Sequence, residues 1–363
     1  MKQQTFSERL HIDIPLLFGL IILCLFGLLI LYSASGQQSA VIYNQVVRML
    51  FAFGLMFLVA QVSPSRLAGV SIWIFLFGVA LLIMVLVIGY IGKGAQRWID
   101  LGVIRFQPSE LMKLAVPMVL AWYLAEKTLP PSLSQIFLSA VIILIPVGLI
   151  VKQPDLGTAI LVSIAGFSVL FIAGMNWRYI TGLVILGALM IPVSWMFMYE
   201  YQRQRVMTFI NPEQDPLGAG YHIIQSMIAI GSGGLYGKGW LNGTQSHLEF
   251  LPERSTDFIF SVLCEEFGFA GVMVLLGLYL FIIYRGLYIS MHAQTTFGKI
   301  LGASIILTFF VYIFVNIGMV SGQLPVVGIP LPLVSFGGTS MVTLMIGFGV
   351  LMGIHTHRRF LSD

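Results

Sequence analysis

The chain has 363 residues, of which 58% are hydrophobic and only 9% are charged, and its mean hydropathy is +0.94. A water-soluble domain of this length needs far more polar surface, so the composition indicates a polytopic helical membrane protein. The formal net charge is +4 without a long run of Lys and Arg, which argues against a nucleic-acid partner and is ordinary for loops on a cytoplasmic membrane surface. Cys24 and Cys264 lie far apart in apolar segments, so neither a disulfide framework nor a metal-ligand spacing is expected.

Ten apolar stretches are long enough to cross the hydrocarbon core, which takes about 20 helical residues. The first is followed by a sequence similar to a signal-peptidase site, but its length of about 19 residues exceeds a usual signal core, so we interpret it as a retained helix. Short connections make neighbouring spans antiparallel, and the even number places both termini on one side. The predicted spans are residues 14–32, 45–62, 68–91, 108–126, 136–152, 157–175, 180–199, 264–284, 298–321 and 338–355.

The Lys and Arg residues of the short loops predict the orientation of the chain. With both termini inside, the loops on that side carry nine basic residues, and the loops on the other side carry five. This bias predicts both termini in the cytoplasm, and it places residues 200–256 outside as one large loop. Most acidic residues fall on the same outer side, where function is therefore expected. The five outer basic residues are candidates for binding an anion: Arg48, Lys93, Arg97, Arg105 and Lys152.

The first polar motif is residues 92–114. Pro108 is typical of the first position of a helix, and Glu110 then lies in the first turn, where a negative charge suits the helix dipole. Glu110 and Lys113 are three residues apart and share a helical face. The motif fits a functional ion pair and, equally well, a helix-start acid with a snorkelling or paired lysine.

The second motif is residues 152–159, between two spans. Asp155 follows a proline, and taken alone it is best interpreted as a turn aspartate. The short connection nevertheless keeps Asp155 near the membrane surface, close to Lys152.

The long loop contains an apolar patch, Ile223 to Ile230, which predicts a re-entrant or interfacial helix. A glycine-rich run follows it, with Lys238 beside the glycines. The run follows no predicted strand and lacks the Lys-Ser or Lys-Thr ending of a phosphate-binding loop, so no nucleotide cofactor is expected.

Residues 250–268 concentrate charge at the mouth of an apolar run. Thr256 is suited to cap a helix whose first residue is Asp257, which is one explanation of that acid. Asp257 and Glu265 are eight residues apart and would share a helical face, whereas Glu266 would be rotated by about 100°. Capping needs one acid, whereas this segment has three carboxylates, with Glu253 and the basic Arg254 just before them. Charge at membrane depth is rarely kept without a use.

The last motif is residues 324–340, a proline-rich stretch that ends in Gly337, Gly338, Thr339 and Ser340. Open backbone N–H groups at the start of the final span fit an anion site. A simple helix breaker fits equally well.

Six short stretches within these regions resemble, in order and spacing, motifs of the SEDS family (shape, elongation, division and sporulation), over nearly the whole chain. They are GAQRW with the following acid, FQPSE with Lys113, QPDLGT, AIGSGGL with its glycines, FLPE to EEFG, and PLPLVSFGG. The likeness is to the rod-shape branch of the family rather than to the division branch. Phe336 stands where the family usually has Tyr, and Phe lacks the hydroxyl group that a contact at this position would need.

The resemblance implies a single transmembrane domain over residues 1–363, with ten helices and a large extracytoplasmic loop between the seventh and eighth. It implies a peptidoglycan glycosyltransferase that polymerises lipid II at the outer face of the bacterial inner membrane during cell elongation. It further implies a class B penicillin-binding protein as partner, other membrane proteins of the elongation complex, and a divalent cation, Mg²⁺ or Mn²⁺. The family's catalytic aspartate falls on Asp257, and its other functional polar positions fall on Glu110, Lys113 and Asp155, with Arg97 nearby.

The chemistry of such a reaction assigns roles to these residues as hypotheses. Asp257 is the general base for an inverting transfer, and Glu265 raises its pKa as a neighbouring carboxylate. Positive charge for the leaving diphosphate comes from Lys113, Arg97 and Lys152, and Asp155 or Glu110 holds the cation. Two alternatives remain: a lipid II flippase or transporter, and a non-catalytic scaffold of the elongation complex.

Overall fold

The computed structural model describes residues 10–92, 95–100, 105–198, 200–214, 219–247 and 253–357. Ten long helices in these ranges correspond one for one to the predicted spans. They are α2 (Ile14–Ala34), α3 (Ser39–Ala60), α4 (Pro64–Ile88), α5 (Pro108–Ala125), α6 (Leu133–Lys152), α7 (Leu156–Ile172), α8 (Trp177–Phe197), α12 (Ile259–Met291), α13 (Thr296–Val320) and α14 (Thr339–Thr356). The prediction of a helical membrane protein with about ten spans is confirmed.

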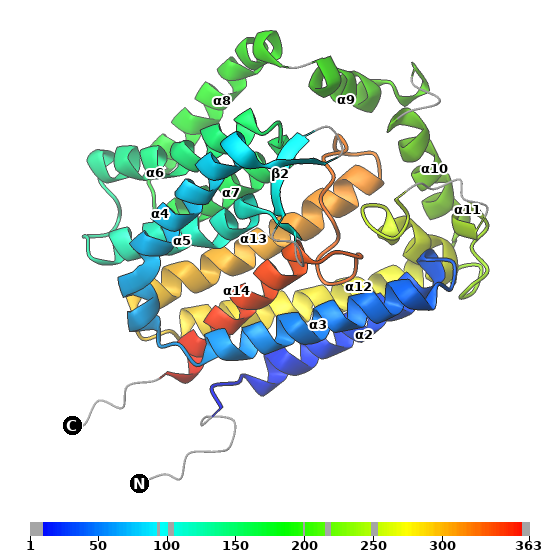
Figure 1. Ribbon diagram of the computed structural model, residues 1–363, viewed down its shortest axis with the longest axis horizontal. Helices are drawn as coiled ribbons and strands as arrows, with labels where there is room; N and C mark the ends of the chain where they lie inside the picture. The colour runs from blue at the N-terminus through cyan, green and yellow to red at the C-terminus, as the bar shows by residue number, and fades with distance from the viewer. Residues whose placement is uncertain are drawn as a thin grey trace.

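Length and apolar composition vary among these helices. Seven of the described helices are long and apolar enough to cross a membrane on those two criteria, while α7 and the described apolar part of α8 are shorter. The first turns of α5 carry Glu110 and Lys113, which makes this span more polar than its neighbours. Figure 1 shows α8 and α9 (Glu200–Ile210) at the margin of the molecule, and residues 181–190 of α8 are exposed.

The helix α13 lies in the middle of the bundle, where it packs against α12, α7, α5 and α14 (Figure 1). Aromatic rings fill the space around it: Phe309 stands edge-on to Tyr279 of α12 at 5.7 Å and to Phe348 of α14 at 5.2 Å between ring centroids. Such contacts lock the helices to one another. The polar side chains in the middle of α13, those of Ser304, Thr308, Tyr312 and Asn316, are consequently buried inside the protein.

A small antiparallel sheet connects α4 to α5. Its strands are β1 (Tyr90–Gly92), β2 (Ala95–Asp100) and β3 (Arg105–Phe106), in the order β1-β2-β3. The sheet was not predicted from the sequence, because the strands are short and glycine interrupts the hydrophobic alternation. It matters for the site, because β2 carries Arg97.

The long loop between α8 and α12 folds into short helices: α9, the 3₁₀ turn η1 (Pro212–Gln214), α10 (Ala219–Ser232) and α11 (Thr244–His247). The predicted helix around Ile223 is confirmed as α10. Its Ser226 is fully buried, donates a hydrogen bond to the Val320 carbonyl, and lies 2.8 Å from the hydroxyl of Ser261 on α12. This loop is therefore docked against the bundle through α10.

The helix α12 is broken at Gly268, whose φ of 59° and ψ of −157° are not helical. Because of the break, two main-chain carbonyls of α12 do not accept the hydrogen bonds of a regular helix. The glycine-rich loop supplies donors to them instead: Lys238 N donates to Glu265 O at 2.9 Å, and Gly239 N donates to Glu266 O at 3.0 Å. In return, Phe269 N and Ala270 N donate to the loop carbonyls of Gly234 and Leu235. A Cβ on Gly237 would collide with the Glu266 carbonyl, so this approach requires glycine.

Candidate functional site

Asp257 lies just before α12 and not on it, which corrects one prediction. The helix begins at Ile259, its N-cap residue is Phe258, and no side-chain capping bond is present there. The Thr256 hydroxyl instead turns back to Glu253, whose carbonyl and carboxylate accept it at 3.1 and 2.9 Å. The explanation of Asp257 as the capped first residue of a helix is therefore wrong.

Three consecutive main-chain carbonyls fix the segment that contains Asp257. The Ser255 carbonyl accepts from Phe336 N at 2.8 Å, the Thr256 carbonyl accepts from the Ser335 hydroxyl, and the Asp257 carbonyl accepts from the Asn316 amide at 3.0 Å. The donors come from the proline-rich loop before α14 and from α13. The backbone of Asp257 is thus held by the tertiary structure rather than by its own helix.

The side chain of Asp257 is half-buried and faces the same proline-rich loop. A Cβ built on Gly328 would lie 3.5 Å from the Asp257 Oδ2, and Gly328 has a φ of 72°. A glycine there leaves room beside the carboxylate and permits the left-handed backbone. The loop is itself ordered by the Ser335 hydroxyl, which accepts from Leu331 N at 2.8 Å.

The carboxylates of Glu265 and Glu266 do not join Asp257. Glu265 lies about two helical turns farther along α12, and its Oε1 accepts from Lys238 Nζ, Thr244 N and Gln245 N at 2.8–3.0 Å. Glu266 accepts from the Ser33 hydroxyl of α2. The expectation that Asp257 and Glu265 share a helical face is wrong, because Asp257 is outside the helix. Glu265 anchors the glycine-rich loop.

Asp155 lies in a second polar cluster, at the start of α7. Its carboxylate caps the helix by accepting from Thr158 N at 3.3 Å, as expected for a turn aspartate. It also accepts from the Gln107 amide at 2.9 Å and lies 3.7 Å from Arg97 Nη1. Arg97 in turn donates to the Gln153 carbonyl at 3.3 Å and to the Pro154 carbonyl. The structure therefore brings Arg97 and Asp155 together.

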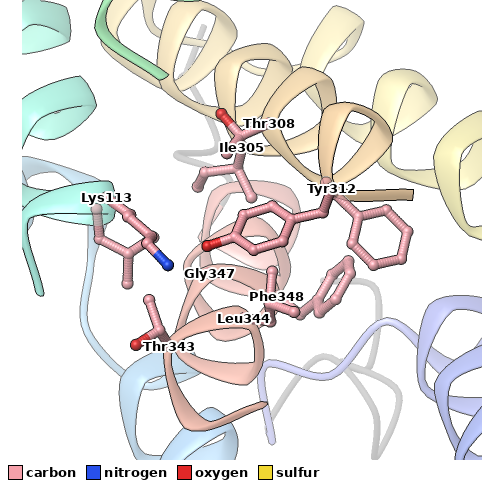
Figure 2. Close-up of a pocket in the computed structure, with 10 residues that line it drawn as sticks. Lys113, Ile305, Thr308, Tyr312, Thr343, Leu344, Gly347 and Phe348 are labelled. Atoms are coloured by element: carbon pink, nitrogen blue, oxygen red, sulfur yellow. The ribbon is translucent and has the colours of Figure 1, made fainter. Parts of the chain in front are cut away.

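Glu110 and Lys113 form a buried ion pair in α5, with 2.6 Å between Oε1 and Nζ. Pro108 and Glu110 occupy the first turn, as predicted. The Lys113 Nζ lies 5.0 Å from the Tyr312 ring centroid, and Figure 2 shows the amino group and the Tyr312 hydroxyl directed toward each other. The pocket between α5, α13 and α14 has a volume of about 20 Å³, which is room for about one water molecule.

Two further basic residues lie at the periphery. Lys152 is the last residue of α6 and is exposed. The Arg48 guanidinium stacks over the Phe336 ring at 4.6 Å and approaches Gly338, the residue before α14. Phe336 thus makes a cation–π contact at a position where the resemblance predicts Tyr. No side-chain cap closes the start of α14.

The sequence model of the cell cycle protein family (FtsW, RodA and SpoVE) matches residues 14–360. The chain belongs to this family. A relative named peptidoglycan glycosyltransferase MrdB, from Escherichia coli strain K12, is 52% identical over 99% of this chain and 98% of its own length. The peptidoglycan glycosyltransferase RodA of Treponema pallidum is 33% identical over 95% and 98%.

Solved structures agree with this family assignment. A chain of a peptidoglycan synthase complex, solved in work on the coordination of polymerization and crosslinking, covers 96% of this chain and 99% of its own length, with 33% identity and a TM-score of 0.84. The rod shape determining protein RodA of Thermus thermophilus covers 97% and 98%, with 30% identity and a TM-score of 0.73. The SEDS fold is thereby shown for this chain.

The carboxylates suggested for a cation in this SEDS protein do not fit a metal site built from protein alone. Asp155 already faces Arg97, and Glu110 already faces Lys113. Among the residues that the structure describes, no three His, Cys, Asp or Glu side chains are grouped for a metal. A divalent cation bound by protein normally uses several oxygen ligands that are not neutralised by a neighbouring cation.

Several residues that lie around Asp257 and the buried pair of this SEDS protein were not predicted from the sequence. Asn316 and Tyr312 lie on α13. Gln107 is the N-cap residue of α5, and Gln45 lies on α3. Gln45 is 1% exposed and donates to the Ser335 carbonyl at 3.3 Å. One signal was available: Ser304, Thr308, Tyr312 and Asn316 recur every four residues in an apolar run, which puts them on one helical face.

Proposed function

We propose that this SEDS protein is a peptidoglycan glycosyltransferase that polymerises lipid II into glycan strands at the outer face of the bacterial inner membrane, during cell elongation. The observation that carries the proposal is the match over nearly the full chain, at 52% identity, to a protein that bears that activity in its name. The position of Asp257 supports it. A half-buried carboxylate at the helix mouth, with its main chain fixed, is suited to general-base work.

In the proposed step, Asp257 accepts the proton of the acceptor sugar's 4-hydroxyl as that oxygen attacks the anomeric carbon of the lipid-linked sugar. A new carbon–oxygen bond forms on the face opposite the leaving group, so the α linkage becomes β. The bond from the anomeric carbon to the diphosphate oxygen breaks, and the diphosphate leaves with its electron pair. Asp257 then returns the proton to solvent. The reaction needs no oxidant or reductant.

Positive charge near the leaving diphosphate would lower the barrier. Arg97, which is partly exposed, and the exposed Lys152 are the candidates with access to a bulky anion, and Arg48 is a further one. Lys113 is 5% exposed and pairs with Glu110, so we assign this pair to the support of the bundle and not to direct phosphate contact. Mg²⁺ or Mn²⁺ stays a prediction of the resemblance, tested by comparing the polymerisation rate with and without a chelator.

The flippase alternative finds less support. A path through the bundle for a disaccharide–pentapeptide head group needs a large polar cavity, and the pocket at the buried Lys113–Glu110 pair, with a volume of about 20 Å³, is too small to be part of one. The deciding experiment supplies the purified protein with lipid II in detergent, where flipping has no meaning, and measures glycan strands by gel analysis. Strands from the wild-type protein, and none from Asp257→Asn, support the proposal. Their absence with wild-type protein contradicts it.

The proposed partner is a class B penicillin-binding protein. One solved structure similar to this chain comes from a peptidoglycan synthase complex in which polymerization and crosslinking are coordinated. We expect a single-span transpeptidase to co-purify with this chain and to raise its polymerisation rate. An isolated protein of full activity, unchanged by the transpeptidase, would contradict this part of the proposal.

The proposed orientation has both termini in the cytoplasm and the loop of residues 200–256 outside. A cysteine at the exposed Asn242 tests it, and Gly243 is unsuitable because it is buried. The two native cysteines are buried, which keeps the background low. We expect an impermeant thiol reagent to label Asn242→Cys in intact spheroplasts. Labelling only after lysis would reverse the orientation.

A further inference from the structure

Asn316 is the only residue with a side-chain amide on α13, and its side chain is completely buried, at 0% exposure. An amide at this depth is unfavourable unless it is hydrogen-bonded. Asn316 uses its nitrogen for two bonds, to the Asp257 carbonyl at 3.0 Å and to the Ile329 carbonyl at 2.7 Å. One side chain therefore joins two irregular segments that are far apart in the sequence.

Both segments lack regular secondary structure at the bonded carbonyls. Asp257 precedes the first residue of α12, and Ile329 lies in the proline-rich loop between α13 and α14. Carbonyls in irregular segments need hydrogen-bond donors from elsewhere in the protein, because no helix or sheet of their own provides them. The Asn316 amide has two N–H groups and can satisfy both at once.

The second bond also concerns Asp257, because Ile329 follows Gly328. A Cβ on Gly328 would lie only 3.5 Å from the Asp257 Oδ2, so Gly328 forms a wall beside the carboxylate. By holding the Asp257 and Ile329 carbonyls on one nitrogen, Asn316 sets the separation between the acid and this wall. The other two donors of the segment, Phe336 N and the Ser335 hydroxyl, bond Ser255 and Thr256 instead.

We propose that Asn316 is a positioning residue for Asp257, which acts by fixing the acid against the proline-rich loop. The inference rests on the proposed function, in which Asp257 takes a proton from the acceptor. A base works within a narrow hydrogen-bonding distance of its proton, about 2.6–3.2 Å between heavy atoms. A displacement of about 1 Å in a group that aligns reactants costs on the order of 10²-fold in rate.

The chain offers a matched control in Tyr279 of α12. Its side chain is 1% exposed, and its hydroxyl donates to the Pro332 carbonyl at 2.8 Å, in the same proline-rich loop. Tyr279→Phe therefore removes a buried hydrogen bond to this loop without touching the Asp257 segment. Loss of stability alone would affect both variants alike, whereas loss of positioning is specific to Asn316.

The experiment uses the full-length protein in detergent with lipid II and compares wild type, Asn316→Leu, Asn316→Gln and Tyr279→Phe. We expect Asn316→Leu to lower kcat by about 10²-fold with KM for lipid II unchanged. Asn316→Gln keeps the donors on a longer stem and should recover part of kcat. Tyr279→Phe should keep the wild-type kcat per folded molecule. If Asn316→Leu does not fold, the test rests on Asn316→Gln, where a lowered kcat at unchanged KM supports the proposal.

Hydrogen–deuterium exchange provides a readout that does not depend on the reaction. In the Asn316 variants, peptides that cover residues 253–258 and 326–331 should both exchange faster, while Tyr279→Phe should leave the first peptide unchanged. Wild-type kcat in both Asn316 variants, or unchanged exchange in both peptides, overturns the positioning role. A wild-type protein that makes no glycan would instead contradict the proposed function, and the exchange data would still decide whether Asn316 holds the segment.

Discussion

Asp257 and Asp13 lie at opposite ends of α12, and the structure treats these two acids in opposite ways. Asp257 precedes the first turn, half-buried, with its main chain held by α13 and the proline-rich loop. Asp13 caps α2 and contacts the far part of α12 through Arg285, which lies well beyond the break at Gly268. The carboxylate of Asp13 is buried and accepts several hydrogen bonds, whereas the carboxylate of Asp257 is half-buried beside a main chain that distant segments fix.

The partners of Asp13 account for both of its oxygens. Arg285 donates from Nε at 3.0 Å and from Nη2 at 2.7 Å, His355 Nδ1 lies at 2.9 Å, and Leu16 N donates at 3.0 Å. Burial by itself favours the neutral acid, but the hydrogen bonds from His355, Arg285 and Leu16 outweigh it and hold the pKa of Asp13 well below its usual range. Asp13 therefore joins α2, α12 and α14 at one end of the bundle.

The contrast between the two acids separates a structural carboxylate from a reactive one in this chain. An acid with a carboxylate saturated by buried partners stabilises the fold and is withdrawn from chemistry. An acid whose main chain is fixed by the tertiary structure, and whose side chain lies near the surface, is well placed for proton transfer. Substitutions of the two acids test this distinction. The substitution of Asp257 should change the rate of polymerisation alone, and the substitution of Asp13 should change the stability alone.

The largest effect is expected for Asp257→Asn. The amide keeps the shape and the carbonyl that Asn316 bonds, but it accepts no proton, so polymerisation should fall by about 10²–10⁴-fold. The thermal midpoint should stay close to that of the wild type, because the helix cap does not involve Asp257. The measurement is glycan synthesis from lipid II together with a melting curve in the same detergent.

Glu253→Gln is the matched control for that variant. Glu253 is an exposed acid four residues earlier in the same turn, with a φ of 53°. Its amide form should polymerise lipid II at nearly the wild-type rate. Normal polymerisation by Asp257→Asn, combined with a lowered melting temperature, would make Asp257 a structural acid and end the contrast with Asp13.

The second effect is expected for Asp13→Asn, and it should appear in stability. The asparagine can still cap α2, but the buried partner of Arg285 is lost, which typically costs about 3–5 kcal/mol. The melting temperature should drop clearly, while kcat for polymerisation per folded molecule stays unchanged. A fall of kcat without a change in melting temperature would show that the Asp13 end of the bundle is coupled to Asp257, and would contradict the distinction between the two acids.

Much of the helical framework follows from the sequence. Each span was visible as an apolar run of sufficient length, and the start of α5 at Pro108 and the turn role of Asp155 followed from local rules. These features depend on a few neighbouring residues. The local rule failed at Thr256, where the hydroxyl bonds Glu253 and the carbonyls of the segment find donors in distant parts of the chain.

The break of α12 and the role of Asn316 were beyond local reasoning. Hydropathy continues across Gly268, so the apolar run gives no sign that the helix stops there. The polar repeat that ends in Asn316 was a visible signal of an inward face, but the segments that would meet this face depend on how α13 packs. Likewise, the placement of Glu265 on a face with Asp257 assumed an unbroken helix that begins earlier than it does.

The third effect concerns Glu265, an acid at the Asp257 end of α12 that resembles Asp13 in its contacts. Its side chain is fully buried against Lys238 at 2.8 Å, with backbone N–H groups of Thr244 and Gln245 on the same oxygen. Glu265→Gln keeps an acceptor and loses the charge, so we expect a stability loss of about 1–3 kcal/mol and nearly normal kcat.

Lys238→Met is the matched control for Glu265→Gln, because it removes the same ion pair from the partly exposed side. The double variant should cost less than the sum of the two single ones, which a double-mutant cycle measures. A strong loss of kcat in Glu265→Gln at unchanged stability would restore the hypothesis that Glu265 tunes Asp257.

The smallest effect is a pH dependence of stability at the Asp13 end of the bundle, to which His11 and Asp13 should contribute in different pH ranges. Burial and the neighbouring His357, with its ring stacked at 3.7 Å, lower the pKa of His11. A histidine with a lowered folded pKa stabilises the fold fully above its unfolded pKa of about 6.5, and this contribution is lost as the pH falls through that range. Asp13 also has a lowered folded pKa, but its unfolded pKa is about 3.9, so its contribution is lost only at more acidic pH.

The melting temperature should therefore decline slightly between about pH 7.5 and 5.5 and steeply below about pH 4. His11→Gln should remove the first decline and keep the second, and Asp13→Asn should do the reverse. A single steep decline near neutral pH in the wild type, retained in His11→Gln, would contradict these separate contributions of His11 and Asp13.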